Sequence, residues 1–244
     1  MSSELTFPPK KVLPVYFVLD TSGSMYGAPI RFLNEAMDGV VQRLINTEAE
    51  IDHVSIRIGV LEFNTFPKWL TAGAGQAEAI ESFDWIPLSA NGLTATGAAL
   101  LTLDQALTEL RKSMQSSAER FYRPVVVFFT DGMPVDDWKT ALLSSLFNNT
   151  LYQKAVKAAV ALGDADIKLL KAIVFADDDG WTWHESPIVP GSVIYTDGHE
   201  QLSGILMTQT ILGVNQSVAS DRIWPEDLKE QEQHENGQDI QDLS

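Results

Sequence analysis

The sequence contains no cysteine, no long apolar run and no cluster of basic residues. Without cysteine there are no disulfide bonds and no thiolate metal sites, which is compatible with a reducing compartment. No apolar stretch approaches the roughly 18 residues that a membrane span requires, and the first residues, MSSELTFPPKK, lack the apolar core of a signal peptide. We therefore expect a cytoplasmic protein that does not enter a membrane.

Positive charge is scarce. The 17 Lys and Arg residues are outnumbered by 33 Asp and Glu residues, which gives a formal net charge of -16 at pH 7. A field of this sign opposes binding to nucleic acid and to anionic lipid, and it favours cations. We expect neither nucleic acid nor a membrane among the partners.

Composition divides the chain of 244 residues into three parts. We expect residues 1–11 to form a loose arm, residues 12–220 a single domain, and residues 221–244 an acidic tail. Residues 226–244 carry too few apolar side chains to offset the entropy of ordering them. We expect this tail to be disordered or to fold on binding, either as a solubility element or as an internal competitor for the site described next.

The segment PVYFVLDTSGSM, residues 14–25, places three oxygen-bearing side chains directly after an apolar run. The run is typical of a strand that is buried on both faces of a parallel sheet. Asp20, Ser22 and Ser24 alternate along the following turn, so their oxygens can converge on one point. This arrangement suits a hard divalent cation, although Asp and Ser are also common in an ordinary turn between a strand and a helix.

Two later segments extend the pattern, namely Thr94 in NGLTATGAAL and Asp131 in VVVFFTDG. Together with the DTSGS turn they resemble the von Willebrand factor type A domains, whose metal-ion-dependent adhesion site combines Asp-x-Ser-x-Ser with a later Thr and a later Asp. The segments TDGMPVDDW and VNQSVAS are similar to the TerY type of bacterial proteins associated with tellurite resistance.

The resemblance implies a function and a set of ligands. Ser22, Ser24 and Thr94 would bind the cation directly, whereas Asp20 and Asp131 would act largely through water. The expected ion is Mg²⁺, which favours octahedral oxygen ligation, with Mn²⁺ and Ca²⁺ as alternatives. The protein would be a non-enzymatic module that takes an Asp or Glu of a partner protein into the open coordination position. The TerY resemblance implies kinase-like or phosphatase-like partners encoded in the same operon, in a stress or tellurite-resistance system.

Two observations qualify this interpretation. An apolar strand followed by Asp-x-x-x-Ser also resembles metal-dependent phosphohydrolases, with Asp20 as the nucleophile. That family places its general acid two residues later, where this chain has Ser22. The adhesion site of the type A domains often contains Gly-Gly-Thr, whereas this chain has Leu93 before Thr94. A positive φ at Leu93 would strain the loop.

The predicted fold class is α/β: a doubly wound, mostly parallel, Rossmann-like sheet with helices on both faces and one antiparallel edge strand. Apolar patterning predicts helices at residues 29–44, 94–114, 136–147, 152–162 and 199–213. It predicts strands at residues 15–19, 51–63, 68–70 and 125–129, within 167–176, and at 192–196.

Aromatic residues mark two further segments. We expect Phe83, Trp85 and Ile86 to pack on the edge of the sheet. Trp181 and Trp183 belong to a loop on the side of the sheet that carries the cation site, where they either pack beneath the loop or contact a partner.

Overall fold

A seven-stranded sheet organises the structure, a computed structural model that describes residues 10–175, 191–196 and 198–220. The strand order is β3-β2-β1-β5-β6-β7, and β4 pairs with β2 beside β3. Five strands are parallel, whereas the short strands β3 and β4 run antiparallel to β2. The strands are β1 (Lys11–Asp20), β2 (Val54–Phe63), β3 (Pro67–Trp69), β4 (Glu78–Ala79), β5 (Val125–Thr130), β6 (Val156–Leu162) and β7 (Gly191–Thr196).

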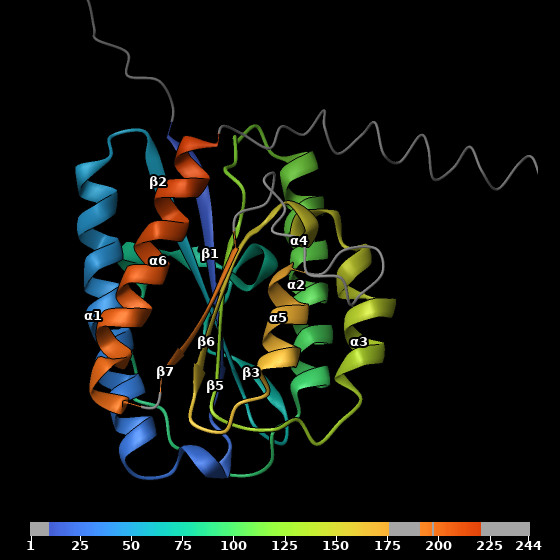
Figure 1. The fold of residues 1–244 in the computed structure, drawn as a ribbon. Coiled ribbons are helices and arrows are strands. Elements are labelled where there is room, and N and C mark those ends of the chain that lie inside the picture. The colour runs from blue at the N-terminus through green and yellow to red at the C-terminus, as the bar shows by residue number, and fades with distance from the viewer. Residues whose placement is uncertain (1–9, 176–190, 197, 221–244) are drawn as a thin grey trace, which may run out of the picture.

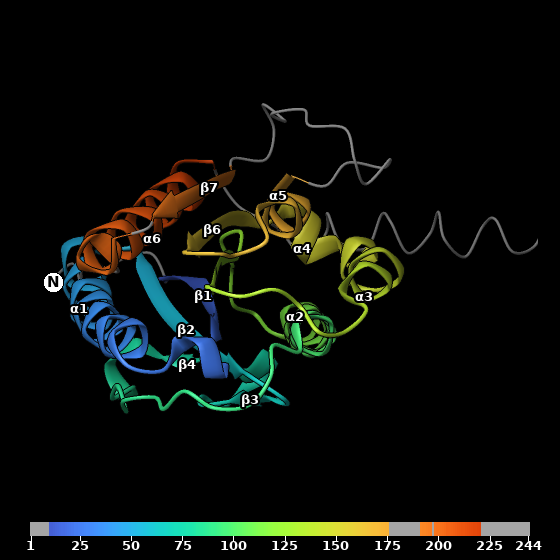
Figure 2. The ribbon, with the colours of Figure 1, turned by 60° about the horizontal axis from the view of Figure 1, so that its bottom comes forward.

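Helices cover both faces of the sheet (Figures 1 and 2). One face carries α1 and α6, and the other carries α2, α3, α4 and α5. The helices are α1 (Ala28–Glu50), α2 (Thr96–Ser116), α3 (Trp138–Ser144), α4 (Thr150–Lys154), α5 (Ile167–Phe175) and α6 (Leu202–Ala219). Short 3-10 helices are η1 (Gly23–Met25), η2 (Ala74–Gln76), η3 (Ile80–Ser82), η4 (Leu146–Asn148) and η5 (His199–Gln201).

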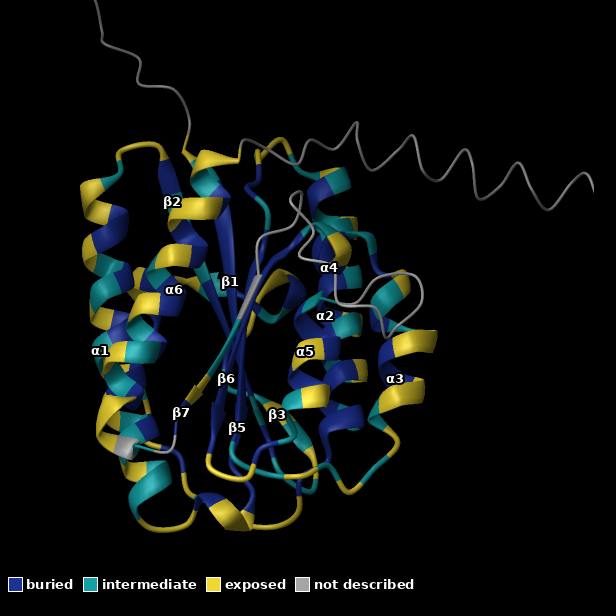
Figure 3. Ribbon diagram, viewed as in Figure 1, coloured by how far each residue is buried: buried dark blue, intermediate teal, exposed yellow. Residues whose placement is uncertain are grey.

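The core lies in two layers, one on each face of the sheet (Figure 3). Successive side chains of a strand point to opposite faces, so Tyr16 and Val18 of β1 join the layer beneath α2, whereas Phe17 and Leu19 join the layer beneath α1 and α6. Every residue of β5 and β6 is buried. A strand buried in this way requires the continuous apolar run seen in the sequence.

The predicted fold class is confirmed. The strands predicted at residues 15–19, 51–63, 125–129 and 192–196 correspond to β1, β2, β5 and β7. The predicted antiparallel edge strand is β3, and β4 adds a second short antiparallel pairing on β2.

The helix predicted at residues 152–162 is wrong. The helix α4 ends at Lys154, and β6 occupies the positions from Val156 to Leu162. The sequence VKAAVAL favours a helix locally because alanine is a strong helix former. The position between β5 and β7 favours a strand instead, because β6 is hydrogen-bonded along both edges and buried on both faces.

The strand predicted within residues 167–176 is also wrong, because α5 occupies this segment. Asp166 caps the helix: its Oδ1 accepts the backbone N–H groups of Lys168 at 2.9 Å and Leu169 at 3.2 Å. Leu169, Leu170 and Ile173 are then buried at helical spacing. The capping aspartate was the sequence signal that distinguished a helix from a strand here.

Two smaller expectations need correction. The closing helix extends beyond residue 213, since α6 ends at Ala219. Ile86 is 73% exposed and does not pack on the sheet edge, whereas Phe83 is buried and Trp85 is partly buried against the same core layer.

Residues 1–9 of the expected arm, the tail from residue 221, and Trp181 and Trp183 lie outside the described residues. In the part of the chain that is described, no helix is both long enough and apolar enough to cross a membrane.

Gly213 lies within α6 and not at its end. A Cβ atom at this position would lie 2.8 Å from Cγ1 of Val125, so the glycine allows the helix to pack closely on β5. Gly204 in the same helix has no atom within 4 Å of the corresponding position.

These two glycines provide a matched test. Gly213→Ala should lower the free energy of unfolding by about 1–3 kcal/mol through overpacking. Gly204→Ala should raise it by about 0.5–1 kcal/mol, because alanine has the higher helix propensity. Urea unfolding of both variants measures the difference, and a gain in stability at position 213 would contradict the close packing of α6 on β5.

Lys157 of β6 is a charged residue within this core. It is 7% exposed, and its Nζ donates a hydrogen bond of 3.0 Å to the backbone oxygen of Tyr152. Burial lowers the pKa of Lys157 to about 8, because removal from water disfavours the charged form.

Lys157→Met should raise the free energy of unfolding by about 1–3 kcal/mol at neutral pH, because it removes a buried charge. Between pH 8 and 10.5 the unfolded chain binds more protons than the folded protein, so the stability of the unsubstituted protein rises with pH across this window. The advantage of the variant should therefore shrink over the same window. Urea unfolding at neutral pH and near pH 10.5 tests this prediction. A stability difference between the variant and the unsubstituted protein that does not change with pH would show that the lysine has its ordinary pKa.

Candidate metal centre

The turn after β1 carries the first three candidate residues. Asp20 ends the strand, and its Oδ1 accepts the backbone N–H of Ser22 at 2.8 Å, which folds the turn back on itself. The 3-10 helix η1 follows, with the N–H of Met25 bonded to the oxygen of Ser22 at 3.1 Å. The hydroxyls of Ser22 and Ser24 lie 3.0 Å apart, so the alternation in the sequence does bring them together.

Asp20 is buried, with no exposed surface. Its Oδ2 accepts a hydrogen bond of 2.5 Å from the hydroxyl of Thr130, the last residue of β5. Burial raises the pKa of Asp20 to about 6, and the negative charge of Asp131 adds to the rise, whereas the hydrogen bonds from Ser22 and Thr130 oppose it. A cation beside this pair of carboxylates would favour their ionised forms.

Thr94 reaches the same place from the loop before α2. Gly92 has the positive φ, 74°, that the loop requires, and Leu93 is not among the described residues with positive φ, so the absence of a second glycine causes no strain. The backbone oxygen of Gly92 accepts the N–H of Gly23 at 3.0 Å, which joins this loop to the turn after β1. The hydroxyl of Thr65 accepts the N–H of Leu93 at 3.0 Å.

The loop before Thr94 is anchored at a distance by Asn34 of α1. The side-chain amide of Asn34 donates to the backbone oxygen of Leu88 at 2.9 Å and accepts the N–H of Leu88 at 2.7 Å. This paired contact imitates the hydrogen bonding of a neighbouring strand, and it fixes an extended segment that has no regular secondary structure.

Asp131 comes from the loop after β5. Its Oδ1 accepts a hydrogen bond of 2.7 Å from the hydroxyl of Ser24. The same loop contacts the Thr94 loop twice: the N–H of Val135 donates to the oxygen of Thr94 at 3.0 Å, and the carboxylate of Asp136 accepts the N–H groups of Gly97 at 2.9 Å and Ala98 at 3.0 Å at the start of α2.

Gly132 shows how closely the side chains converge. A Cβ atom at Gly132 would lie 3.3 Å from the Thr94 hydroxyl oxygen and 3.4 Å from that of Ser24. Hydroxyls from two separate loops therefore face the same small space beside Asp131. In residues 10–175, 191–196 and 198–220 no three His, Asp or Glu side chains gather to hold a cation. Within these ranges the candidate donors are therefore hydroxyls together with Asp20 and Asp131, and this set of serine, threonine and aspartate oxygens fits a hard divalent ion.

The site opens into a depression of about 540 Å³ at the carboxyl ends of the parallel strands. Ser22, Ser24, Thr94 and Asp131 line it, and Asp164, from the loop after β6, lines its wall. Ligands of open α/β sheets bind at this edge because the loops that leave the strands form a crevice there.

The geometry does not suit Asp20 as a nucleophile. Each of its carboxylate oxygens accepts a hydrogen bond, and the residue is fully buried. A nucleophile must reach the reacting atom of a substrate, and a general acid must lie within hydrogen-bonding distance of the leaving group. Ser22 occupies the position of that acid.

Sequence reasoning did not assign roles to three residues that build the site, Thr130, Asp136 and Asn34. The sequence did carry a signal for Asp136, because two adjacent aspartates precede a helix. Asp137 caps α3, whereas Asp136 turns to α2. The contacts of Thr130 and Asn34 span long stretches of sequence and have no local signature.

Comparison with solved structures shows the same fold in several proteins. A von Willebrand factor type A protein from Catenulispora acidiphila is 18% identical and has a TM-score of 0.53; the match covers 83% of this chain and 42% of that one. A D319A mutant of the PilB minor pilin from Streptococcus sanguinis is 12% identical with a TM-score of 0.54, covering 88% of this chain and 65% of that one.

A third structure is proximal thread matrix protein 1 from the mussel byssus, described with a zinc-occupied MIDAS motif. It is 15% identical, with a TM-score of 0.50, and the match covers 83% of this chain and 48% of that one. The chain thus spans about two fifths to two thirds of the length of these relatives. No curated protein matches the sequence.

The family model for the von Willebrand factor type A domain matches residues 15–184, which include the turn after β1, the Thr94 loop and the loop after β5. On this match the chain belongs to the von Willebrand factor type A domain family.

Proposed function

We propose that this protein is a non-enzymatic, metal-dependent module that binds a partner protein. In this proposal Ser22, Ser24 and Thr94 bind a divalent cation directly, whereas Asp20 and Asp131 act on it largely through water. The observation that carries it is the convergence of the Ser24 and Thr94 hydroxyls beside Asp131, around the space that a Cβ at Gly132 would fill. The bound ion would supply an open coordination position for a carboxylate of the partner.

Mg²⁺ is the proposed ion, with Mn²⁺ and Ca²⁺ as alternatives. Hydroxyl and carboxylate oxygens are hard donors, and Mg²⁺ retains water where protein ligands are few. The zinc-occupied MIDAS motif of the mussel protein supports a divalent ion at this kind of site.

The biological setting is proposed from the sequence resemblance to the TerY type. The protein would act in the cytoplasm in a stress or tellurite-resistance system, on a kinase-like or phosphatase-like protein that presents an Asp or Glu. Purification of complexes from the native cell with Mg²⁺, and again with chelator, would identify the partner. A partner that remains bound in chelator would contradict a contact made through the ion.

The metal site can be tested with Ser24→Ala, because Ser24 is exposed and its loss should leave the fold intact. Asp20 is less suitable: it is buried, and its removal would leave two hydrogen-bond donors without an acceptor, at a cost of about 1–3 kcal/mol each. Mg²⁺ should raise the melting temperature of the unsubstituted protein, since it binds only the folded state. Ser24→Ala and Thr94→Ala should reduce this shift and weaken Mg²⁺ binding at least about 10-fold, or about 1.4 kcal/mol.

Calorimetry with Mg²⁺ and with Mn²⁺ measures the affinity directly. Ser89→Ala is the matched control, because Ser89 is exposed and lies outside the depression. If Ser24→Ala and Thr94→Ala bind Mg²⁺ as the control does, the ion is held elsewhere.

We also propose that Trp181 and Trp183 contribute to the partner surface, because aromatic residues on loops near a binding site are favoured interface anchors. Replacement of both by alanine should weaken binding of the identified partner at least about 10-fold without lowering the melting temperature. Titration calorimetry and thermal unfolding are the two measurements. A large loss of stability with unchanged affinity would instead place the tryptophans in the packing beneath the loop.

A further inference from the structure

Large apolar side chains gather around the candidate metal centre. Ten large hydrophobic residues are exposed in the described part of the chain, and five of them lie on the loops that form the site. These five, here called the apolar rim, are Tyr26 (81% exposed), Phe66 (76%), Met133 (59%), Val135 (58%) and Leu93 (55%).

Contacts place each member of the rim. Leu93, Met133 and Val135 line the same depression as the candidate ligands. Tyr26 follows Ser24 in the turn after β1, where its N–H donates to Gly23 at 3.2 Å. Phe66 follows Thr65, whose hydroxyl accepts the N–H of Leu93. The rim is therefore built on four loops that are joined by hydrogen bonds, not on one mobile segment.

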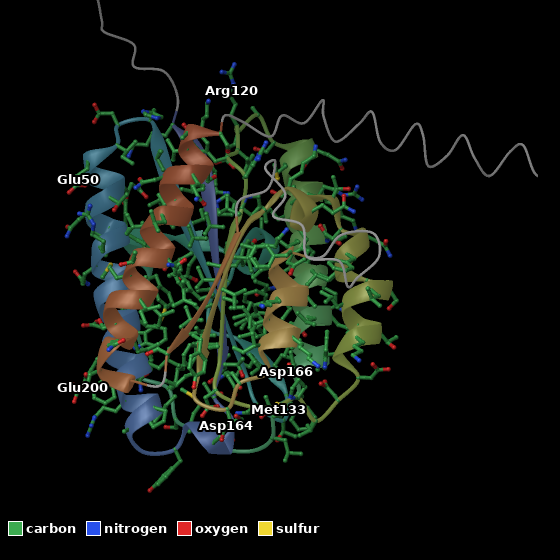
Figure 4. All side chains as sticks on the ribbon, viewed as in Figure 1. Glu50, Arg120, Met133, Asp164, Asp166 and Glu200 are labelled. Carbon is green, nitrogen blue, oxygen red and sulfur yellow. The ribbon has the colours of Figure 1, made fainter. Side chains whose placement is uncertain are left out.

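The charged side chains that line the depression are of one sign. Among the described residues, its lining contains Asp131 and Asp164 but no Lys, Arg or His. These lining residues offer no cationic side chain to a partner carboxylate, which the bound ion would hold instead. Asp164 is exposed on the wall, with Met133 at the same end of the molecule (Figure 4). It is available to pair with a basic residue of the partner.

Exposed apolar side chains that surround a polar centre are typical of an interaction surface. Burial of such side chains against apolar side chains of a partner stabilises a complex, and a lone carboxylate on a hydrated ion does not provide this contribution. The rim therefore favours a partner that brings apolar side chains together with its acid.

We infer that the partner presents a segment in which one Asp or Glu is flanked by large apolar residues, with a Lys or Arg nearby that pairs with Asp164. This inference rests on the proposed function, because the acid is held through the ion. It adds a basis for specificity that the proposed function lacks, because the residues beside the partner's acid distinguish it from the many carboxylates on other proteins.

The test is a selection from a random peptide library displayed on phage, with the unsubstituted protein immobilised in Mg²⁺ and the bound phage eluted with chelator. The eluted peptides should share an Asp or Glu with Leu, Ile, Phe or Met within two positions, and should be enriched in Lys or Arg. Peptides eluted by chelator whose acid has polar neighbours would overturn this inference alone. A selection that yields no peptide released by chelator would overturn the proposed function, and this inference with it.

Variants then assign the effect to the rim. With a selected peptide as the probe, Leu93→Ser combined with Met133→Ser should weaken binding at least about 10-fold and leave the affinity for Mg²⁺ unchanged. The matched control is Leu101→Ser combined with Leu143→Ser, which removes two exposed leucines of α2 and α3 outside the depression. Equal effects of the two double variants would overturn the role of the rim.

Asp164→Asn tests the basic residue of the segment. The variant should weaken peptides that carry Lys or Arg about 2- to 5-fold, less at high salt, as expected for an exposed ion pair. Asp84→Asn, on an exposed residue outside the depression, is the control. If Asp164→Asn binds these peptides as tightly as the control does, Asp164 makes no such contact.

Discussion

The buried carboxylate of Asp20 joins the two central strands at the end where the site lies. One oxygen accepts the N–H of Ser22 and fixes the shape of the turn, and the other accepts the hydroxyl of Thr130 and holds this turn against the end of β5. With the turn in this position, the hydroxyl of Ser24 meets Asp131. Asp20 therefore determines the shape of the turn through its hydrogen bond to the backbone, in addition to contributing a negative charge. The Thr94 loop and the loop after β5 are arranged around this turn.

Much of the fold could be predicted from the sequence, because a strand buried on both faces needs a continuous apolar run and β1 and β5 have one. The two errors lie together at β6 and α5. An alanine-rich strand and an apolar helix carry the opposite local preferences, and only their place in the sheet, or the cap at Asp166, separates them. Gly213 illustrates the same limit, since a glycine at an apparent helix end serves here for close packing on Val125.

The candidate site could likewise be predicted only in part from the sequence. Spacing along the chain predicts that Asp20, Ser22 and Ser24 share one turn, and the family resemblance selects Thr94 and Asp131; the structure brings all five together. Spacing did not predict that Asp20 is buried or that Asp136 caps the helix after Thr94. These properties arise from contacts between separate loops, which no local pattern records. The exposure of Met133 and Val135 is likewise a property of the assembled surface.

The bonds that assemble the site join residues far apart in the sequence: 110 positions separate Asp20 from Thr130, and 107 separate Ser24 from Asp131. Ribosomes add about 5–20 residues per second. The turn after β1 therefore waits about 5–20 s for its counterpart to be synthesised. Until then it carries a carboxylate without the strand that buries it, so a nascent or truncated chain that stops before β5 contains Asp20, Ser22, Ser24 and Thr94 but lacks Asp131 and the hydrogen bond from Thr130 that holds the turn against β5. The partner binding proposed for this site would thus be restricted to chains whose synthesis has passed the middle of the domain.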